Sequence, residues 1–287
     1  MTTIALALAQ TTESLVATGN LEACFEGEVL VMHALGLSRA QLYSRWTEPL
    51  DGSRTAFLQK QVARRQQGEP LAYILGHREF YGLDLAVDRR VLIPRPETEL
   101  LVEAALGWIS NHQQRPSLVA DIGTGSGAIA VSLAHMRPDI AIYATDRSPE
   151  ALTLARENVA RHGLADRVTL LEGDLVAPLP EPVDLLVANL PYVKETDLPA
   201  WCGSAQVELA WEPNIALDGG PDGLDIIGRF LDQAPEHLHY DGAVFLEIGW
   251  DQGEETVRLA RAAFPSARIS LHKDFAGLDR IVAIQCG

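Results

Sequence analysis

Four consecutive residues, Asn189-Leu190-Pro191-Tyr192, offer the most specific chemistry in this sequence. The Asn189 side-chain oxygen and the Leu190 main-chain carbonyl could accept both N–H hydrogens of a planar amide or aromatic amine. These acceptors would turn the delocalised lone pair of that nitrogen towards a methyl donor. Pro191 would stiffen the turn, and the Tyr192 ring would stack on the flat group. The alternative interpretation is an Asn-x-Pro turn with a packed tyrosine.

A glycine-rich run further upstream predicts a bound nucleotide-like ligand. The run is Asp121-Ile-Gly123-Thr124-Gly125-Ser126-Gly127, and Asp146 follows at about the 20-residue spacing of a ribose-binding acid. Glycines permit a tight strand-to-helix turn, and the helix N-terminus offers free N–H groups. Dinucleotide enzymes and methyltransferases share both features, and a plain turn followed by a helix N-cap would also explain them. Only the tetrad at 189–192, for which a nicotinamide enzyme has no need, separates these alternatives.

Short apolar runs alternate with helical segments from residue 117 onward. Strands are expected at 117–121, 140–144, 168–171, 183–188, 242–248 and 281–284, and helices near 127–136, 148–163, 223–238 and 251–263. This alternation predicts a mainly parallel α/β sheet with helices on both faces. Ligands bind at the carboxyl edge of such sheets, so the fold would bring the glycine run, Asp146 and the tetrad together.

The first part of the chain has a different pattern. Residues 1–75 show helical periodicity, with Gly36 as a helix stop, Ser38 as an N-cap and a break at 68–70. Residues 76–92 read as a hairpin with Gly82 near its turn, and they form the expected linker to a domain at 93–287. The helical segment either stabilises the rest of the protein or docks a partner.

Composition narrows the classes of function. The 287 residues carry a formal charge of −16, which disfavours general binding to a phosphate backbone. No apolar run approaches the roughly 18 residues of a membrane span, and the first residues lack the basic region of a secretory signal. Three distant cysteines, Cys24, Cys202 and Cys286, fit neither a disulfide framework nor a four-thiolate zinc site. We therefore expect a cytoplasmic protein with no metal and no membrane association.

Three longer runs add a resemblance. The segments 68–82, 91–99 (Val-Leu-Ile-Pro-Arg-Pro-Glu-Thr-Glu) and 212–224, together with the tetrad, resemble the HemK/PrmC family of peptide-chain-release-factor glutamine N5-methyltransferases. The resemblance covers nearly the whole chain. It implies a Rossmann-like class I methyltransferase domain behind a small N-terminal helical bundle. It also implies methyl transfer from S-adenosyl-L-methionine, which becomes S-adenosyl-L-homocysteine, to the glutamine of the Gly-Gly-Gln loop in bacterial class I release factors.

The same resemblance implies roles for individual residues. It assigns catalysis to Asn189, Pro191 and Tyr192, and substrate binding to Asn189, Leu190, Pro191, Tyr192, Arg95 and Glu97. It assigns cofactor binding to Asp121, Gly123, Thr124, Gly125, Ser126, Gly127, Asp146, Asp174, Leu175 and Asn189. Arg95, Glu97 and Glu99 either line the glutamine site or fasten the linker to the catalytic domain. The helices at 1–75 would dock the release factor, and a monomer without stable nucleic-acid binding is expected.

One residue departs from the pattern of the family. The usual tetrad is Asn-Pro-Pro-Tyr, whereas this chain has Leu190 at the second position. Asn-Leu-Pro-Tyr also resembles ribosomal RNA adenine dimethyltransferases. The alternative function is therefore an adenine-N6 methyltransferase that acts on RNA or DNA, although a main-chain carbonyl survives the exchange of proline for leucine.

Overall fold

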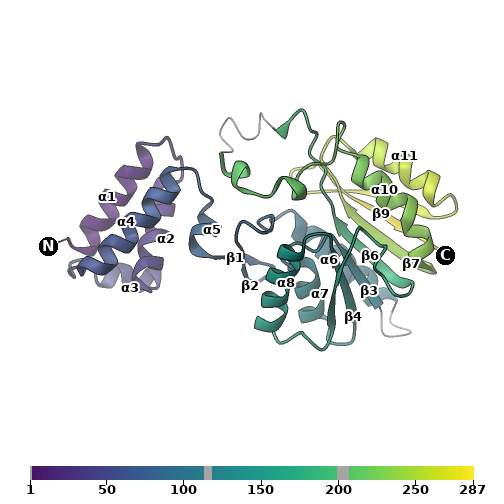
Figure 1. Cartoon of the computed structure of the whole chain (residues 1–287), viewed down its shortest axis with the longest axis horizontal. Coiled ribbons are helices and arrows are strands. Elements are labelled where there is room, and N and C mark those ends of the chain that lie inside the picture. Colours follow the sequence, from purple (N-terminus) through teal and green to yellow (C-terminus); the bar gives the residue numbers. More distant parts are fainter. Residues whose placement is uncertain (1, 113–117, 199–206) are drawn as a thin grey trace. The chain divides into compact units, whose positions relative to one another are not determined.

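The computed structural model of the chain describes residues 2–112, 118–198 and 207–287. These residues form two compact units, which divide between Gly76 and His77 (Figure 1). Within the described ranges, no helix is long and apolar enough to cross a membrane. Cys24 and Cys286 are free thiols, and Cys202 lies outside the described residues.

The smaller unit consists of helices, and the two caps that the sequence predicts are present. They are α1 (Ile4–Val16), α2 (Ala23–Leu35), α3 (Arg39–Ser44), α4 (Gly52–Gln66) and α5 (Leu71–Leu75). Gly36 ends α2 in the left-handed region, and Ser38 forms a capping box at α3. Leucines with no exposed surface, Leu15, Leu30 and Leu42, lie in its core. The sequence did not predict α5, because a single turn shows too little periodicity to be recognised.

The hairpin expected as a linker belongs structurally to the larger unit. It consists of β1 (His77–Phe80) and β2 (Leu83–Ala86), and it turns at Tyr81 and Gly82, both with positive φ. Phe80 and Leu85 are buried in the core of the larger unit. The Asn158 side chain exchanges two hydrogen bonds with the backbone of Ala86. Residues from His77 onward therefore pack with the following fold.

The larger unit contains a seven-stranded sheet with the order β5-β4-β3-β6-β7-β9-β8 (Figure 1). Its strands are β3 (Leu118–Ile122), β4 (Ala141–Asp146), β5 (Val168–Glu172), β6 (Val183–Asn189), β7 (Leu238–Glu247), β8 (Arg268–Lys273) and β9 (Asp279–Gln285). The strands from β5 to β7 are parallel, and β9 and β8 pair antiparallel at one side. The sequence missed β8, because this edge strand has no buried residue and hence no apolar run.

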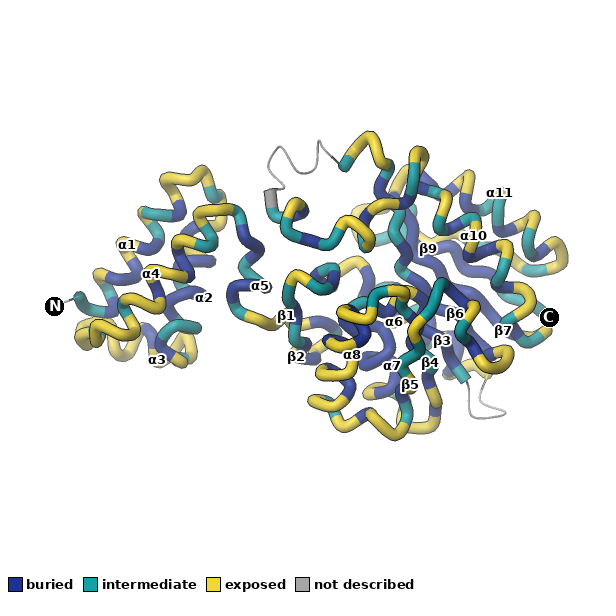
Figure 2. The backbone as a smooth tube through the Cα atoms, viewed as in Figure 1, coloured by how far each residue is buried: buried dark blue, intermediate teal, exposed yellow. Residues whose placement is uncertain are grey.

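Helices cover both faces of this sheet. One face packs on α6 (Thr98–Asn111), α7 (Ala128–Met136) and α8 (Pro149–Arg161), and the other on α10 (Asp225–Gln233) and α11 (Gly253–Ala263). Short 3₁₀ turns lie at Val207–Trp211, Asn214–Ala216 and Ala234–His237. Neighbouring strand residues alternate between the two cores, as Leu185 and Leu186 do, so the central strands are buried on both sides (Figure 2). The predicted Rossmann-like α/β fold is thereby confirmed.

Candidate active site

The carboxyl ends of four neighbouring strands carry the polar residues of the site. The glycine run follows β3, and Asp146, Asn189 and Glu247 end β4, β6 and β7. In the register of the sheet, Asn189 lies directly beside Glu247. A cavity of about 420 Å³ opens at this edge, and a second of about 290 Å³ adjoins it through shared lining residues such as Asn189, Leu190 and Arg95. The sheet edge therefore forms a two-part pocket, as expected for this fold.

The glycine loop is held against the adjacent strand by its own backbone. Gly123 and Thr124 donate their N–H groups to the Thr145 carbonyl, each at 2.9 Å. Gly123, Gly125 and Gly127 all have positive φ, which glycine adopts without strain. A Cβ on Gly123 would lie 3.1 Å from the Leu190 side chain, so this glycine also makes room for the tetrad. Thr124, Gly125 and Ser126 line the larger cavity.

Asp121 lies behind this loop and does not line the cavity. Its Oδ2 accepts hydrogen bonds from the Thr124 hydroxyl at 2.6 Å and from the Ala130 N–H at 3.1 Å. Its Oδ1 has no hydrogen-bond partner among the described residues. Complete burial raises the pKa of Asp121 to about 7. Asp121 thus stabilises the glycine loop and the start of α7 through these two hydrogen bonds.

Asp146 lines the cavity with a carboxylate that is already oriented. Its Oδ2 accepts from Gly125 N–H at 2.8 Å, and its Oδ1 accepts from Ser148 N–H at 2.9 Å. Burial raises the pKa of Asp146 above its ordinary value, and the backbone donors oppose this shift. Each carboxylate oxygen keeps a lone pair, so the group retains acceptor capacity for a pair of hydroxyls.

Asp174 and Leu175 line the same cavity beyond the end of β5. Leu175 has a φ of 51°, an uncommon conformation for a branched side chain. The buried Thr145 hydroxyl donates to the Leu175 carbonyl at 2.9 Å and holds this backbone in place. Asp174 pairs with Arg229 of α10. Leu175 therefore holds an uncommon backbone conformation at the wall of the cavity.

The Asn189 side chain has a defined orientation. Its Nδ2 donates to the hydroxyl of Thr98, the first residue of α6, at 3.0 Å. With the nitrogen engaged in this way, the amide oxygen is the atom left to accept from a ligand. Leu190 is buried with 3% of its surface exposed. Asn189 and Leu190 both line the two cavities.

Tyr192 is fixed from two sides. Its hydroxyl donates to Glu247 Oε1 at 3.5 Å, and its carbonyl accepts from Gln252 Nε2 at 3.0 Å. The same Gln252 nitrogen donates to the Gly223 carbonyl, and a Cβ on Gly223 would lie 2.4 Å from the Tyr192 oxygen. Burial, and secondly the charge of Glu247, raise the pKa of Tyr192, so the phenol stays neutral.

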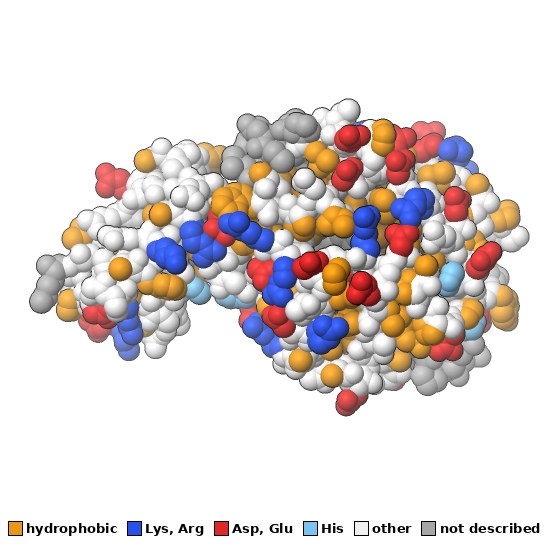
Figure 3. Space-filling view, viewed as in Figure 1, with side chains coloured by type: hydrophobic (Ala, Val, Ile, Leu, Met, Phe, Trp, Pro, Cys, Tyr) orange, Lys and Arg blue, Asp and Glu red, His pale blue; other side chains and the backbone are white. Residues whose placement is uncertain are grey.

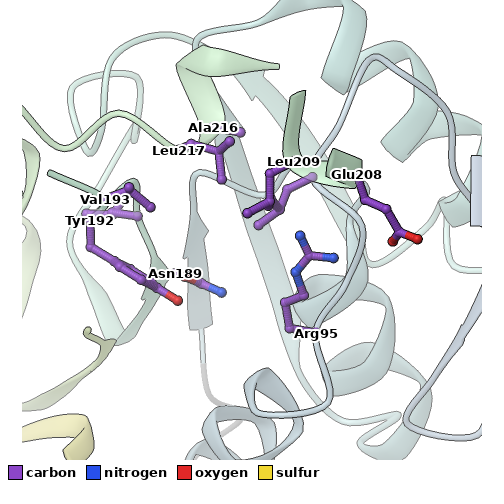
Figure 4. Close-up of a pocket in the computed structure, with 10 residues that line it drawn as sticks. Arg95, Asn189, Tyr192, Val193, Glu208, Leu209, Ala216 and Leu217 are labelled. Carbon is purple, nitrogen blue, oxygen red and sulfur yellow. The ribbon is translucent and has the colours of Figure 1, made fainter. Parts of the chain in front are cut away.

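Some residues of the run at 95–99 line the pocket, and Glu99 of the same run binds the hairpin. Arg95 lines both cavities and binds Glu212 through one nitrogen, at 2.7 and 2.8 Å to the two carboxylate oxygens. Figure 4 shows Arg95, Asn189 and Tyr192 around the smaller cavity. Glu97 is the N-cap residue of α6, and Glu99 accepts from Tyr81 N–H at 2.9 Å, which fastens the hairpin. Arg95 and Thr98 of this run line the pocket, whereas Glu97 and Glu99 do not.

Sequence reasoning missed several residues of the site. Thr98 lies within the quoted run at 91–99 but has no local signal for its contact with Asn189. Glu247 ends an apolar strand that the sequence did predict, and only the strand order places it beside the tetrad. Glu212 and Gln252 act through contacts 117 and 60 residues away in the chain.

Two family models match the chain. The PrmC N-terminal domain matches residues 7–76, and the methyltransferase small domain matches residues 98–209. A release factor glutamine methyltransferase of Moorella thermoacetica is 44% identical over 97% of this chain and 96% of its own length. One from Bordetella pertussis is 43% identical over 89% of this chain and 92% of its own.

This chain belongs to the release factor glutamine methyltransferase family. Among solved structures, the catalytic domain of hMettl16 in complex with the MAT2A 3'UTR hairpin 1 has a TM-score of 0.55. It shares 14% identity, covers 85% of this chain and 84% of its own, and supports the methyltransferase fold alone.

The family uses S-adenosyl-L-methionine, and the larger cavity fits this cofactor. The cofactor carries a ribose, a sulfonium, an amino group and a carboxylate. The cavity offers the acceptor Asp146, exposed loop backbone at Gly125, and a mixed lining of four aspartates and three arginines: Asp146, Asp174, Asp218, Asp225, Arg90, Arg95 and Arg147. No Cβ contact within 4 Å would arise at Gly125, so that backbone borders open space.

Proposed function

We propose that this protein transfers a methyl group from S-adenosyl-L-methionine to the side-chain amide nitrogen of the glutamine in the Gly-Gly-Gln loop of bacterial class I release factors. The observation that carries the proposal is the orientation of Asn189. Thr98 holds its nitrogen at 3.0 Å, which leaves its oxygen to accept from a substrate at the junction of the two cavities. Identities above 40% to relatives named for this activity support the same conclusion.

The residues of the larger cavity hold the cofactor in this proposal. Asp146 accepts the ribose hydroxyls, the 123–127 loop lies against the cofactor with bare backbone, and the Asp174–Leu175 segment borders the adenine. Asp121 acts from behind the loop through Thr124 and the Ala130 N–H. The bound cofactor supplies an electrophilic methyl group on a positively charged sulfur.

The tetrad orients the acceptor. The Asn189 oxygen and the Leu190 carbonyl accept the two N–H hydrogens of the substrate amide. This directs the lone pair of the amide nitrogen towards the cofactor in the larger cavity. Pro191 limits the turn, and the Tyr192 ring covers the flat amide group. Arg95, steadied by Glu212, closes the opposite wall. Positioning accounts for most of the rate enhancement here, because the methylated nitrogen is acidic and loses its proton readily.

The helices before Gly76 dock the release factor in this proposal. A glutamine side chain offers few contacts, so recognition needs additional protein surface. Leu21 and Phe25 lie on the smaller unit with 101% and 62% of their surface exposed.

We further propose that the enzyme is a cytoplasmic monomer without stable nucleic-acid binding. The charge of −16 disfavours general binding to a phosphate backbone. Figure 3 shows acidic and basic side chains interspersed on the visible face.

Methylation assays on three separate substrates test the proposal. The enzyme is incubated with labelled S-adenosyl-L-methionine and either intact release factor, a release factor whose Gly-Gly-Gln glutamine is replaced by glutamate, or ribosomal RNA. We expect label in the first sample alone. Label in the RNA would instead favour adenine-N6 methylation, the alternative that Leu190 raises.

A further inference from the structure

A buried acid beside the tetrad has no part in the mechanism above. Glu247 ends β7 and lies beside Asn189 in the register of the sheet, with 1% of its surface exposed. Its Oε1 accepts from the Tyr192 hydroxyl, whereas its Oε2 has no hydrogen-bond partner among the described residues. An incompletely paired carboxyl group costs stability, so its place at this site requires a reason.

The contacts of Thr98 suggest that reason. Its hydroxyl accepts the Asn189 Nδ2 hydrogen at 3.0 Å, so its own hydrogen must go to another acceptor. The Thr98 side chain lies close enough to Glu247 to lower the pKa of that acid, and Glu247 Oε2 is an acceptor without a partner among the described residues. Asn189 thus donates to Thr98, Thr98 has a hydrogen to give beside Glu247, and Tyr192 donates to the Glu247 carboxylate.

On the basis of the function proposed above, we propose that Glu247 is a positioning residue for methyl transfer. Its ionised carboxylate accepts from Thr98 and Tyr192 together. Through Thr98 it fixes the Asn189 amide with the oxygen directed at the substrate. One acid thus holds both ends of the tetrad, and it does so without touching the substrate or the cofactor.

Protonation of Glu247 reverses this arrangement. A carboxylic acid donates its hydrogen to Thr98, and the Thr98 hydroxyl then donates to the Asn189 oxygen. The Asn189 amide turns over and presents N–H hydrogens to a substrate amide that itself needs acceptors. The enzyme is therefore active when Glu247 is ionised and loses activity on acidification.

The surroundings place this protonation near neutral pH. Burial raises the pKa of Glu247 to about 7, and Glu97 at the start of α6 acts in the same direction. Thr98, Arg280 of β9 and Tyr192 oppose the shift. These neighbours come from the start of α6, from β9 and from the tetrad, so the balance is a property of the assembled site.

The test measures kcat and KM of the full-length enzyme on intact release factor between pH 5.5 and 9. Wild type, E247Q and a control variant, D184N, are compared. Asp184 is a buried carboxylate near the opposite end of β6, where it accepts from Leu118 N–H at 2.8 Å. We expect kcat of wild type and D184N to fall by up to tenfold per pH unit below about 7.

E247Q is expected to lose this acid limb, because an amide does not titrate there. Its kcat at pH 8 should be about 10- to 100-fold lower, the range for one charge-assisted hydrogen bond, with KM values for both substrates within about twofold of wild type. An acid limb that persists in E247Q, or a loss that resides in KM alone, would overturn the proposal.

If E247Q does not fold, a second pair of variants tests the same link. T98S keeps the hydroxyl that links Asn189 to Glu247, whereas T98V has a similar shape and no hydroxyl. We expect kcat of T98S to exceed that of T98V by at least about tenfold. Equal kcat values overturn the inference alone. Wild-type enzyme that fails to methylate release factor at any pH would overturn the proposed function itself, and the inference with it.

Discussion

Replacement of Asp146 by alanine tests the assignment of the cofactor cavity. The change removes a carboxylate that lines the cavity and that two backbone N–H groups, those of Gly125 and Ser148, hold at 2.8 and 2.9 Å. Loss of charge-assisted hydrogen bonds to the ribose weakens binding by about 1.5–3 kcal/mol. The dissociation constant for S-adenosyl-L-methionine should therefore rise by about 10- to 150-fold.

Calorimetric titration of folded protein measures this effect. Asp139→Ala is the matched control, because Asp139 lies just before the other end of β4 and pairs on the surface with Arg137. Its affinity should equal that of wild type. Since burial raises the pKa of Asp146, wild-type affinity should weaken on acidification at a higher pH than an exposed aspartate would cause. Unchanged affinity in a folded Asp146→Ala variant would refute the assignment.

Three further outcomes follow from the structure. Burial raises the pKa of Asp121 to about 7, so the stability that its protonated form contributes is present below about pH 4 and is lost as the pH rises through 7. In urea unfolding, the unfolding free energy of the wild type should fall by about 3 kcal/mol between pH 5 and 8, and Asp121→Asn should not show this fall. Leu190→Pro should retain kcat within about threefold in the methylation assay, because proline keeps the main-chain carbonyl; near-total inactivity of a stable variant would contradict the carbonyl's role. The double change Leu21→Ser and Phe25→Ser should raise KM for release factor and leave the rate on a short Gly-Gly-Gln peptide unchanged. The control Tyr240→Ser, at a residue with 86% exposure near the amino end of β7, should change neither quantity.

Local patterns in the sequence predicted the parts of the site that depend on neighbouring residues. The glycine run, Asp146 and the tetrad each follow an apolar strand, and parallel strands must bring such residues to one edge. The hairpin turn at Gly82 and the caps at Gly36 and Ser38 were predictable for the same local reason. These features need no knowledge of which strands are adjacent.

The remaining features depend on contacts between distant segments. Glu247 lies beside Asn189 only because β7 follows β6 in the sheet, and the sequence does not state that order. Arg95 left two roles open until Glu212, 117 residues away, was found to fix it at the pocket. The strand β8 escaped prediction because its edge position leaves it without buried residues.

Tandem mass spectrometry of the release factor gives the most direct test of the central claim. Purified bacterial release factor is incubated with the enzyme and S-adenosyl-L-methionine, digested, and its Gly-Gly-Gln peptide is fragmented. The account predicts one added methyl group on the glutamine side chain, and none when Asn189→Ala replaces the wild-type enzyme. A methyl group on another residue, or an unmodified peptide after prolonged incubation with active wild-type enzyme, would contradict it.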